Sequence, residues 1–347
     1  MHFAPTARLK PVSLPPNARI LVKSLNWLGD IVMSLPALWA VRLRYPQAHL
    51  AVLVREELAS FYTATPWIDR IIPYPIAGQA HRWRRRWNLI RNLARERWDA
   101  GIVLPRSFES ALWFALARIP IRIGVAAQAR SSLLTHPLGI DLKQPDRHLT
   151  ESYLLLVCSG LDCGVPPAQP ALLAPSLEQP FALHGPYVVM APGAAFGPAK
   201  QWPLWHWQEL SRALARKNLH IVLVGTESER PLCEEIRAAI PAACSTLAGK
   251  TNLPQLMAVI AHGCAFVGND SGATHLAAAL GVRTVALFGS TNPLRTAPRG
   301  SRCRVLYDPP PCSPCLQRTC RFGHYDCLAR ITPDRVLAAI DELGYPG

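Results

Sequence analysis

The chain has 347 residues, of which 50% are hydrophobic and 17% charged, a composition that excludes a disordered protein and predicts substantial folded cores. Its 37 lysines and arginines outnumber 23 acidic residues, and the formal net charge of +14 favours anionic partners: phosphorylated substrates, nucleic acid or an acidic membrane surface. The N-terminal sequence lacks the apolar core of a signal peptide, and no apolar run reaches the roughly 18 residues that span a bilayer. We therefore expect a cytoplasmic protein, at most peripheral to a membrane, with mainly reduced cysteines.

Short strand-like runs alternate with helical patterns from Arg19 onward. The strand-like runs of the first half are ILVKS (20–24), HLAVLV (49–54), RIIPY (70–74), DAGIVL (99–104) and IRIGV (121–125). The helical patterns between them are Ile31–Tyr45, Arg82–Arg97 and Ser107–Arg118. Such alternation is typical of βαβ units around a parallel sheet.

The alternation restarts after a proline-rich stretch, which predicts a linker. The later strand-like runs are YVVMAP (187–192), LHIVLVG (219–225), CAFVGND (264–270) and TVALFG (284–289). The later helical patterns are Pro203–Lys217, Glu227–Ala239, Leu253–His262, Gly272–Leu280 and Pro333–Leu343. We predict an α/β protein with an extension at 1–18, a Rossmann-like domain at 19–164, a linker at 165–186, a second Rossmann-like domain at 187–332 and a C-terminal helix at 333–347.

Asp30 ends the segment KSLNWLGD (23–30), which follows the first strand and leads into a long helix. Gly29 permits a tight loop, and N–H groups at a helix start can hold an anion. A carboxylate at this edge, within reach of a substrate hydroxyl, can act as a general base. The alternative, which the local sequence by itself favours, is a structural N-cap.

Lys200 lies in the segment APGAAFGPAKQWP (191–203), between a strand and a helix. The glycines allow backbone N–H groups to approach a phosphate, and the lysine supplies a point charge. The glycine spacing is not that of a Walker A loop, and no Ser or Thr follows the lysine. The alternative is an ordinary loop with a solvated lysine.

The segment GNDSGATH (268–275) ends a strand and begins another helix, an arrangement suited to a diphosphate. Asp270 could accept hydrogen bonds from sugar hydroxyls, and His275 lies in the first turns of the helix. The structural alternative makes Asp270 or Ser271 a cap and His275 a buried histidine. The segment FGST (288–291) adds a polar strand end on the same side of the sheet.

Four segments together resemble the ADP-heptose:lipopolysaccharide heptosyltransferases, and are most similar to the heptosyltransferase II branch of that family. They are NWLGDIVMSLPAL (26–38), PGAAFGPAKQWP (192–203), NDSGATHLAAALG (269–281) and FGSTNPLRTAP (288–298). CSPCLQRTCRFGHYDCL (312–328) is also similar to that branch. Each motif is weak alone, but their order over residues 26–328 covers nearly the whole chain.

The resemblance implies a GT-B fold, in which two Rossmann-like domains with parallel sheets face a central cleft. It implies an inverting transfer of L-glycero-D-manno-heptose from ADP-heptose to the lipopolysaccharide inner core, placing the second heptose on the first, with no cofactor required for catalysis. The alternatives are a related transferase with another acceptor (heptosyltransferase I or III) and a non-catalytic nucleotide-sugar-binding protein.

The resemblance also implies roles for single residues. Asp30 corresponds to the proposed catalytic base, and Lys200 to the lysine near the donor phosphates. The donor-binding DSG motif corresponds to Asp270, Ser271, Gly272 and His275. An inverting attack needs one base, unlike the carboxylate pair of hydrolases, and Lys200 with the helix start could stabilise the departing diphosphate in place of a metal.

A basic stretch with interleaved tryptophans covers Arg82–Trp98. It predicts a contact with the inner membrane, at its cytoplasmic face, or with acceptor phosphates. The alternative is a solvated helix face with Trp87 and Leu89 packed inward. We expect no nucleic-acid partner, because nothing else in the chain resembles a nucleic-acid-binding module.

Cysteines at 312, 315, 320 and 327, with a histidine at 324, supply enough soft ligands for a structural zinc site. The candidate ligands are Cys312, Cys315, Cys320 and Cys327. Their spacing is irregular for a zinc ribbon or finger, so reduced thiols, or a disulfide formed after isolation, are the alternatives. Such a zinc ion would not be catalytic.

Overall fold

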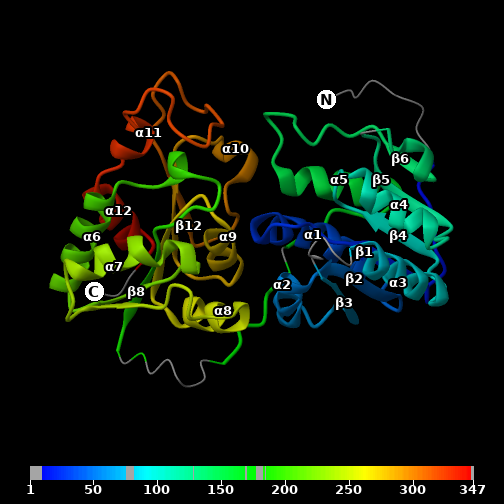
Figure 1. Cartoon of the computed structure of the whole chain (residues 1–347), viewed down its shortest axis with the longest axis horizontal. Coiled ribbons are helices and arrows are strands. Elements are labelled where there is room, and N and C mark those ends of the chain that lie inside the picture. The colour runs from blue at the N-terminus through cyan, green and yellow to red at the C-terminus, as the bar shows by residue number, and fades with distance from the viewer. Residues whose placement is uncertain are drawn as a thin grey trace. The chain divides into compact units, whose positions relative to one another are not determined.

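The computed structural model describes residues 10–75, 82–127, 129–168, 170–176, 183 and 185–344. For Arg82 and Trp83, at the start of the basic helix, it describes the backbone but not the side chains. The chain divides into two compact units, 1–171 and 172–347 (Figure 1). The division falls inside the stretch predicted as a linker. Each unit is built around one six-stranded parallel sheet.

The sheet of the first unit has the order β3-β2-β1-β4-β5-β6. Its strands are β1 (Arg19–Lys23), β2 (His49–Arg55), β3 (Arg70–Tyr74), β4 (Ala100–Val103), β5 (Ile121–Val125) and β6 (His136–Leu138). In the register, Ile20 pairs with Leu50 on one side and Ala100 on the other. β1 is buried almost throughout because it lies in the middle of the sheet and helices cover both faces.

Two helix pairs cover this sheet. The helices are α1 (Leu28–Arg44), α2 (Glu56–Ala59), α3 (Arg82–Arg95), α4 (Phe108–Leu116) and α5 (Leu149–Leu161). Side chains of α3 and α4 share one apolar cluster with Leu21 and Leu53. Because side chains alternate along a strand, the residues next to Leu21 and Leu53 face the opposite side of the sheet. On that side α1 packs along α5, and Gly160 of α5 approaches Ile123.

The sheet of the second unit has the order β12-β11-β10-β7-β8-β9. Its strands are β7 (Tyr187–Ala191), β8 (His220–Leu223), β9 (Cys244–Thr246), β10 (Ala265–Asn269), β11 (Thr284–Phe288) and β12 (Cys303–Tyr307). The helices are α6 (Leu204–Arg216), α7 (Arg230–Ala238), α8 (Leu253–His262), α9 (Gly272–Ala279), α10 (Pro293–Thr296), α11 (Asp326–Ala329) and α12 (Pro333–Glu342). One core cluster joins α6, α7 and α12 to Val188 and Met190 of β7, while α8 and α9 pack together.

Four elements of this fold, besides the four-residue helices α2, α10 and α11, have no counterpart among the sequence predictions: β6, α5, β9 and β12. The three strands lie at or next to sheet edges and two of them have only three residues, too short to show a period. α5 is apolar on several sides because it is largely buried against α1, which hides its helical period. Residues 10–18 of the predicted extension pack onto the first unit, where Leu14 and Ala18 are buried.

In both sheets the order in which the chain adds strands reverses at one point. In each, the first strand of the unit lies beside the fourth, so the chain first moves outward to one edge and then to the other. A crevice at the carboxyl ends of these two central strands is where doubly wound sheets bind ligands. In the first unit this point lies between β1 and β4, and in the second between β7 and β10. Two Rossmann-like parallel sheets, as the GT-B prediction requires, are therefore confirmed.

Candidate active site

The Lys200 loop and the Asp270 loop meet at the switch point of the second unit. The first follows β7 and the second follows β10, and these strands are paired with Gly268 opposite Ala191. The sequence separates the two loops by about 70 residues, yet the Lys200 Nζ atom lies 2.5 Å from Asp270 Oδ2. The interpretation of Lys200 as a solvated loop lysine is therefore wrong.

Asn269, the last residue of β10, fixes the Lys200 loop in place. Its side chain is fully buried, accepts a hydrogen bond from Trp202 N and donates to the carbonyl oxygens of Pro192 and Gly193. Unpaired buried polar groups are costly, so these contacts define one position for the loop. No sequence signal indicates this role, because an Asn before a turn such as Asp-Ser-Gly is typical of any strand end.

Asp270 is the centre of the polar cluster and is only 7% exposed. Besides Lys200, Thr291 Oγ1 donates to its Oδ2 atom at 2.7 Å, and His275 Nε2 lies 4.0 Å from its Oδ1 atom. Thr291 comes from the loop after β11, so three neighbouring strands contribute to the cluster. The structure thus brings together Lys200, Asp270 and His275, and it joins to them Thr291 of the polar segment FGST (288–291).

The start of α9 lies directly beside this cluster. Ser271 occupies the N-cap position, but its side chain accepts no capping hydrogen bond from the backbone and instead contacts Thr274 Oγ1 at 3.2 Å. Asp270 precedes the cap. Gly272 is the first residue of the helix, whose N-terminal N–H groups carry partial positive charge. A helix start next to Lys200 is suited to a phosphate group.

A fourth strand end at this edge, that of β8, carries carboxylates that were not among the predicted site residues. Glu227 and Glu229 follow β8, and Glu229 forms a capping box with Thr226. A Cβ atom on Gly193 would lie 2.0 Å from Glu229 Oε1, so Glu229 would have to leave its present position if this residue of the Lys200 loop carried a side chain. In dinucleotide-binding sheets an acidic residue at the neighbouring strand end binds the ribose. The position of Glu227 and Glu229 after a strand was therefore the sequence signal that could have found these two residues.

Asp30 lies at the switch point of the first unit, after β1. It is the third residue of α1, whose N-cap is Trp27 in an extended conformation, so the interpretation of Asp30 as the N-cap residue is wrong. Gly29 is likewise the second helical residue and not part of a loop. In the first turn the helix dipole stabilises the ionised carboxylate, and the side chain is partly exposed.

Lys23, at the end of β1, is the unexpected residue of this edge. Its side chain is 1% exposed, its Nζ atom donates to Ser24 O at 2.8 Å, and the ammonium lies 4.6 Å from the centre of the Tyr74 ring. Burial, and secondly the positive charge of Arg55, lower its pKa to about 7. Tyr74 in turn donates to Asn26 Oδ1, which helps to hold the loop that leads to Asp30.

The predicted basic stretch forms α3, and its outer face is as basic as expected. Its exposed residues include Arg84, Arg85, Trp87, Arg91 and Arg95. Ile90 and Leu93 point into the core, and Leu89 packs against it. The alternative interpretation placed Trp87 inward, which is wrong because 54% of this residue is exposed. Among the helices in the described ranges, none is both long and apolar enough to cross a membrane.

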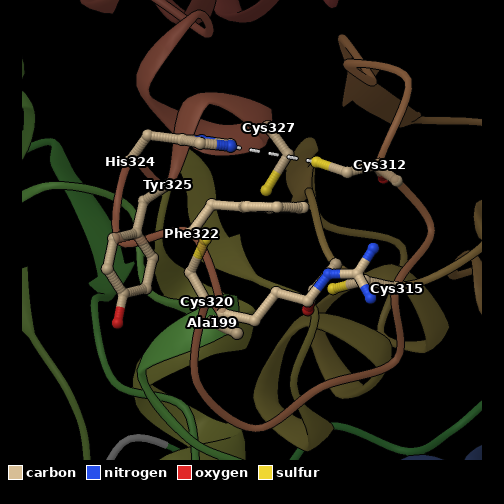
Figure 2. A pocket seen from close by; sticks show the side chains of 11 residues that line it. Ala199, Cys312, Cys315, Cys320, Phe322, His324, Tyr325 and Cys327 are labelled. Atoms are coloured by element: carbon tan, nitrogen blue, oxygen red, sulfur yellow. Dashed lines mark hydrogen bonds between the residues drawn. The ribbon is translucent and has the colours of Figure 1, made fainter.

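The predicted cysteine cluster surrounds one pocket (Figure 2). Cys312, Cys315, Cys320 and Cys327 line it together with His324, and Cys312 Sγ lies 4.0 Å from His324 Nε2. Within the described residues, however, no three His, Cys, Asp or Glu side chains are grouped as ligands of one metal ion. In the arrangement described, the thiols line the pocket wall without converging on a common centre.

Comparison with known proteins identifies the family. The family model of glycosyltransferase family 9 (heptosyltransferase) matches residues 86–326. The chain belongs to glycosyltransferase family 9. The prediction of a glycosyltransferase that resembles the heptosyltransferases is therefore confirmed.

Individual members of family 9 are similar over most of the chain. Lipopolysaccharide heptosyltransferase 2 of Salmonella typhimurium is 34% identical over 346 residues, which cover 94% of this chain and 98% of that protein. Lipooligosaccharide heptosyltransferase 2 of Haemophilus influenzae is 31% identical over 342 residues, which cover 93% of this chain and 99% of that protein. The solved structure of Escherichia coli ADP-heptose lps heptosyltransferase II has a TM-score of 0.80 at 32% identity, covering 94% of this chain and 98% of that one.

Proposed function

We propose that this family 9 enzyme transfers heptose from ADP-heptose to the inner core of lipopolysaccharide, adding the second heptose to the first. The similarity to heptosyltransferase 2 proteins over nearly their whole length supports this substrate pair. The observation that carries the proposal is the cluster of Lys200, Asp270 and Thr291 beside the start of α9 at the switch point of the second unit.

The second unit binds the ADP-sugar in this proposal. Lys200 and the first N–H groups of α9 contact the diphosphate, while Asp270, Ser271, Gly272 and His275 contact the donor around it. Negative charge develops on the diphosphate as the anomeric bond breaks. Fixed donors and a nearby ammonium stabilise that charge in the transition state without a metal ion.

Asp30 of the first unit is the proposed general base. It accepts the proton of the acceptor hydroxyl as this oxygen attacks the anomeric carbon from the face opposite ADP, which inverts the configuration. It lies in the first turn of α1, where the helix dipole favours a negative charge. No second carboxylate is needed, because ADP leaves without protonation by an acid.

A structural zinc ion at the cysteine cluster is a further part of the proposal. Four thiols and His324 around one pocket support it, whereas the present arrangement brings no three described ligands together. Zinc would therefore require the thiolates to move toward a common centre, and it would tie the segment together without taking part in catalysis.

We place the enzyme at the cytoplasmic face of the inner membrane, with the outer face of α3 against anionic headgroups. Exposed arginines and the exposed Trp87 ring support this contact. The neighbouring helix α4 exposes Phe108 and Leu116, and Arg86 of α3 forms an ion pair with Glu109 of α4 at 2.6 Å.

The test of the reaction is an incubation with ADP-heptose and lipopolysaccharide truncated after the first heptose. We expect release of ADP and an acceptor heavier by one heptose. A truncated acceptor that ends before the first heptose distinguishes the related type I activity. A protein that binds ADP but releases none from ADP-heptose with either acceptor would be a non-catalytic nucleotide-sugar-binding protein.

A further inference from the structure

The segment after β12 packs onto two of the loops that form the proposed donor site. Three hydrogen bonds fix it there: Ser313 Oγ to Gly289 O at 2.6 Å, Leu316 N to Ser290 O at 2.8 Å and Ala199 N to Arg318 O at 3.0 Å. The last of these bonds ties the backbone of Arg318 to the residue directly before Lys200. Arg318 was not among the predicted site residues, and it is one of two arginines between Cys312 and Cys327.

Gly197 shows how closely Arg318 approaches the Lys200 loop. Its φ angle is 143°, a conformation that residues with a Cβ atom rarely adopt. A Cβ atom here would also lie only 2.6 Å from the Arg318 carbonyl oxygen. The close contact of the two segments therefore depends on glycine, and it places Arg318 at a fixed point along the loop.

The side chain of Arg318 shares an aromatic ring with Lys200. The Arg318 guanidinium carbon lies 5.5 Å from the centre of the Phe196 ring, and Lys200 Nζ lies 4.9 Å from the same centre. Arg318 is exposed, and no ion pair joins it to a carboxylate in the part of the chain that the structure describes. Phe196 thus contacts two cations, the Lys200 ammonium and an Arg318 guanidinium that is available for a ligand.

The charges at this edge explain why a second cation is needed. Lys200 is already paired with Asp270, so together they contribute no net positive charge. Glu227 is paired with Arg230, and Glu229 adds a further carboxylate. An ADP-sugar brings negative charge on both phosphates, and the leaving ADP carries more. Compensation of that charge by Lys200 alone would require Lys200 to abandon Asp270.

We propose that Arg318 is a second phosphate-binding residue of the donor site, which acts with Lys200 from beside the Phe196 ring. This inference rests on the proposed ADP-sugar donor. A guanidinium can donate two parallel hydrogen bonds to phosphate oxygens, which an ammonium cannot. Arg318 adds positive charge for the diphosphate while Lys200 keeps its contact with Asp270.

The test compares Arg318→Gln with Arg321→Gln by calorimetric titration with ADP and with adenosine. Arg321 is the matched control, because it belongs to the same segment but its guanidinium lies over Phe322, 4.7 Å from that ring centre. Arg318→Gln changes an exposed side chain and leaves its backbone hydrogen bond to Ala199 in place, so the melting temperature should match the wild type.

We expect Arg318→Gln to weaken ADP binding roughly ten- to a hundredfold, the range for a charge-assisted hydrogen bond, and to leave adenosine binding unchanged. Arg321→Gln should bind both as the wild type does, and Arg318→Lys should recover part of the ADP affinity. Equal ADP affinity in both glutamine variants, or an equal loss for adenosine and ADP, would overturn the role of Arg318. A wild-type protein that does not bind ADP at all would instead overturn the donor assignment on which the inference rests.

Discussion

Lys200 Nζ and Asp270 Oδ2 lie 2.5 Å apart, although the two residues come from loops after different strands. Their side chains are 14% and 6% exposed, so the pair is largely withdrawn from water and weakly screened. Asp270 holds the lysine at the edge of the proposed donor site, beside the start of α9. A buried pair of this kind positions a charge for a ligand more than it stabilises the fold.

Lys200→Ala should weaken ADP binding and transfer together. Loss of a hydrogen bond to a charged group costs about 1.5–3 kcal/mol, which corresponds to roughly ten- to a hundredfold in ADP affinity. The control is Lys217→Ala, which removes a lysine whose ion pair with Asp341 is exposed on both sides. Unchanged ADP affinity and turnover in Lys200→Ala would show that the lysine does not contact the phosphates.

Asp30→Asn should abolish most of the transfer rate and leave donor binding intact. The amide keeps the size of the carboxylate but cannot accept the proton, and loss of a general base typically costs about a hundred- to ten-thousandfold in rate. ADP titration and a melting curve must accompany the rate measurement. A folded variant that transfers heptose at nearly the wild-type rate would restrict Asp30 to a structural role in the first turn of α1.

Lys23→Met should change how stability depends on pH. The folded-state pKa of Lys23, about 7, lies below the ordinary lysine pKa of 10.5, so the unfolded chain binds more protons between these values. Burial of Lys23 therefore destabilises the fold fully below pH 7, and the cost disappears as the pH rises toward 10.5. In denaturant unfolding, the stability of Lys23→Met relative to wild type should be highest below pH 7 and should fall above it. A difference independent of pH would contradict the lowered pKa.

Chelation should leave transfer intact, because the proposed mechanism uses no metal ion.

For the cysteine cluster, the zinc proposal predicts about one zinc per chain in protein purified under reducing conditions, and a lower melting temperature after chelation. Elemental analysis and melting curves measure both. Metal-free protein with an unchanged melting temperature would contradict the zinc proposal. The cluster would then consist of four reduced thiols, Cys312, Cys315, Cys320 and Cys327.

Arg91→Gln combined with Arg95→Gln should weaken binding to vesicles of phosphatidylcholine and phosphatidylglycerol. Each arginine near an anionic surface contributes about 1 kcal/mol, so the affinity should fall about fivefold per residue. Arg304→Gln is the control, since this exposed arginine is paired with Glu342 in the second unit. Equal sedimentation of both variants with these vesicles would contradict membrane contact through α3.

The sequence by itself determined the class of fold and marked most residues of the proposed donor site. Alternating strand-like and helical periods predicted two parallel-sheet units, because such periods depend on local burial. Strand-to-helix turns likewise marked Asp30, Lys200 and Asp270, since ligands of these sheets bind where strands end. Elements without a clear period, such as β9 and α5, were missed because their burial is decided by neighbours distant in the chain.

Only the tertiary structure decided which residues act together. The pairing of β7 with β10 brings Asn269 to the Lys200 loop and Lys200 to Asp270, and no local pattern encodes either contact. The packing of the cysteine-rich segment on Gly197 likewise brings Arg318 to Phe196. Hydrogen bonds and charges act over a few ångströms of space, whereas sequence periods report only whether a residue faces the core.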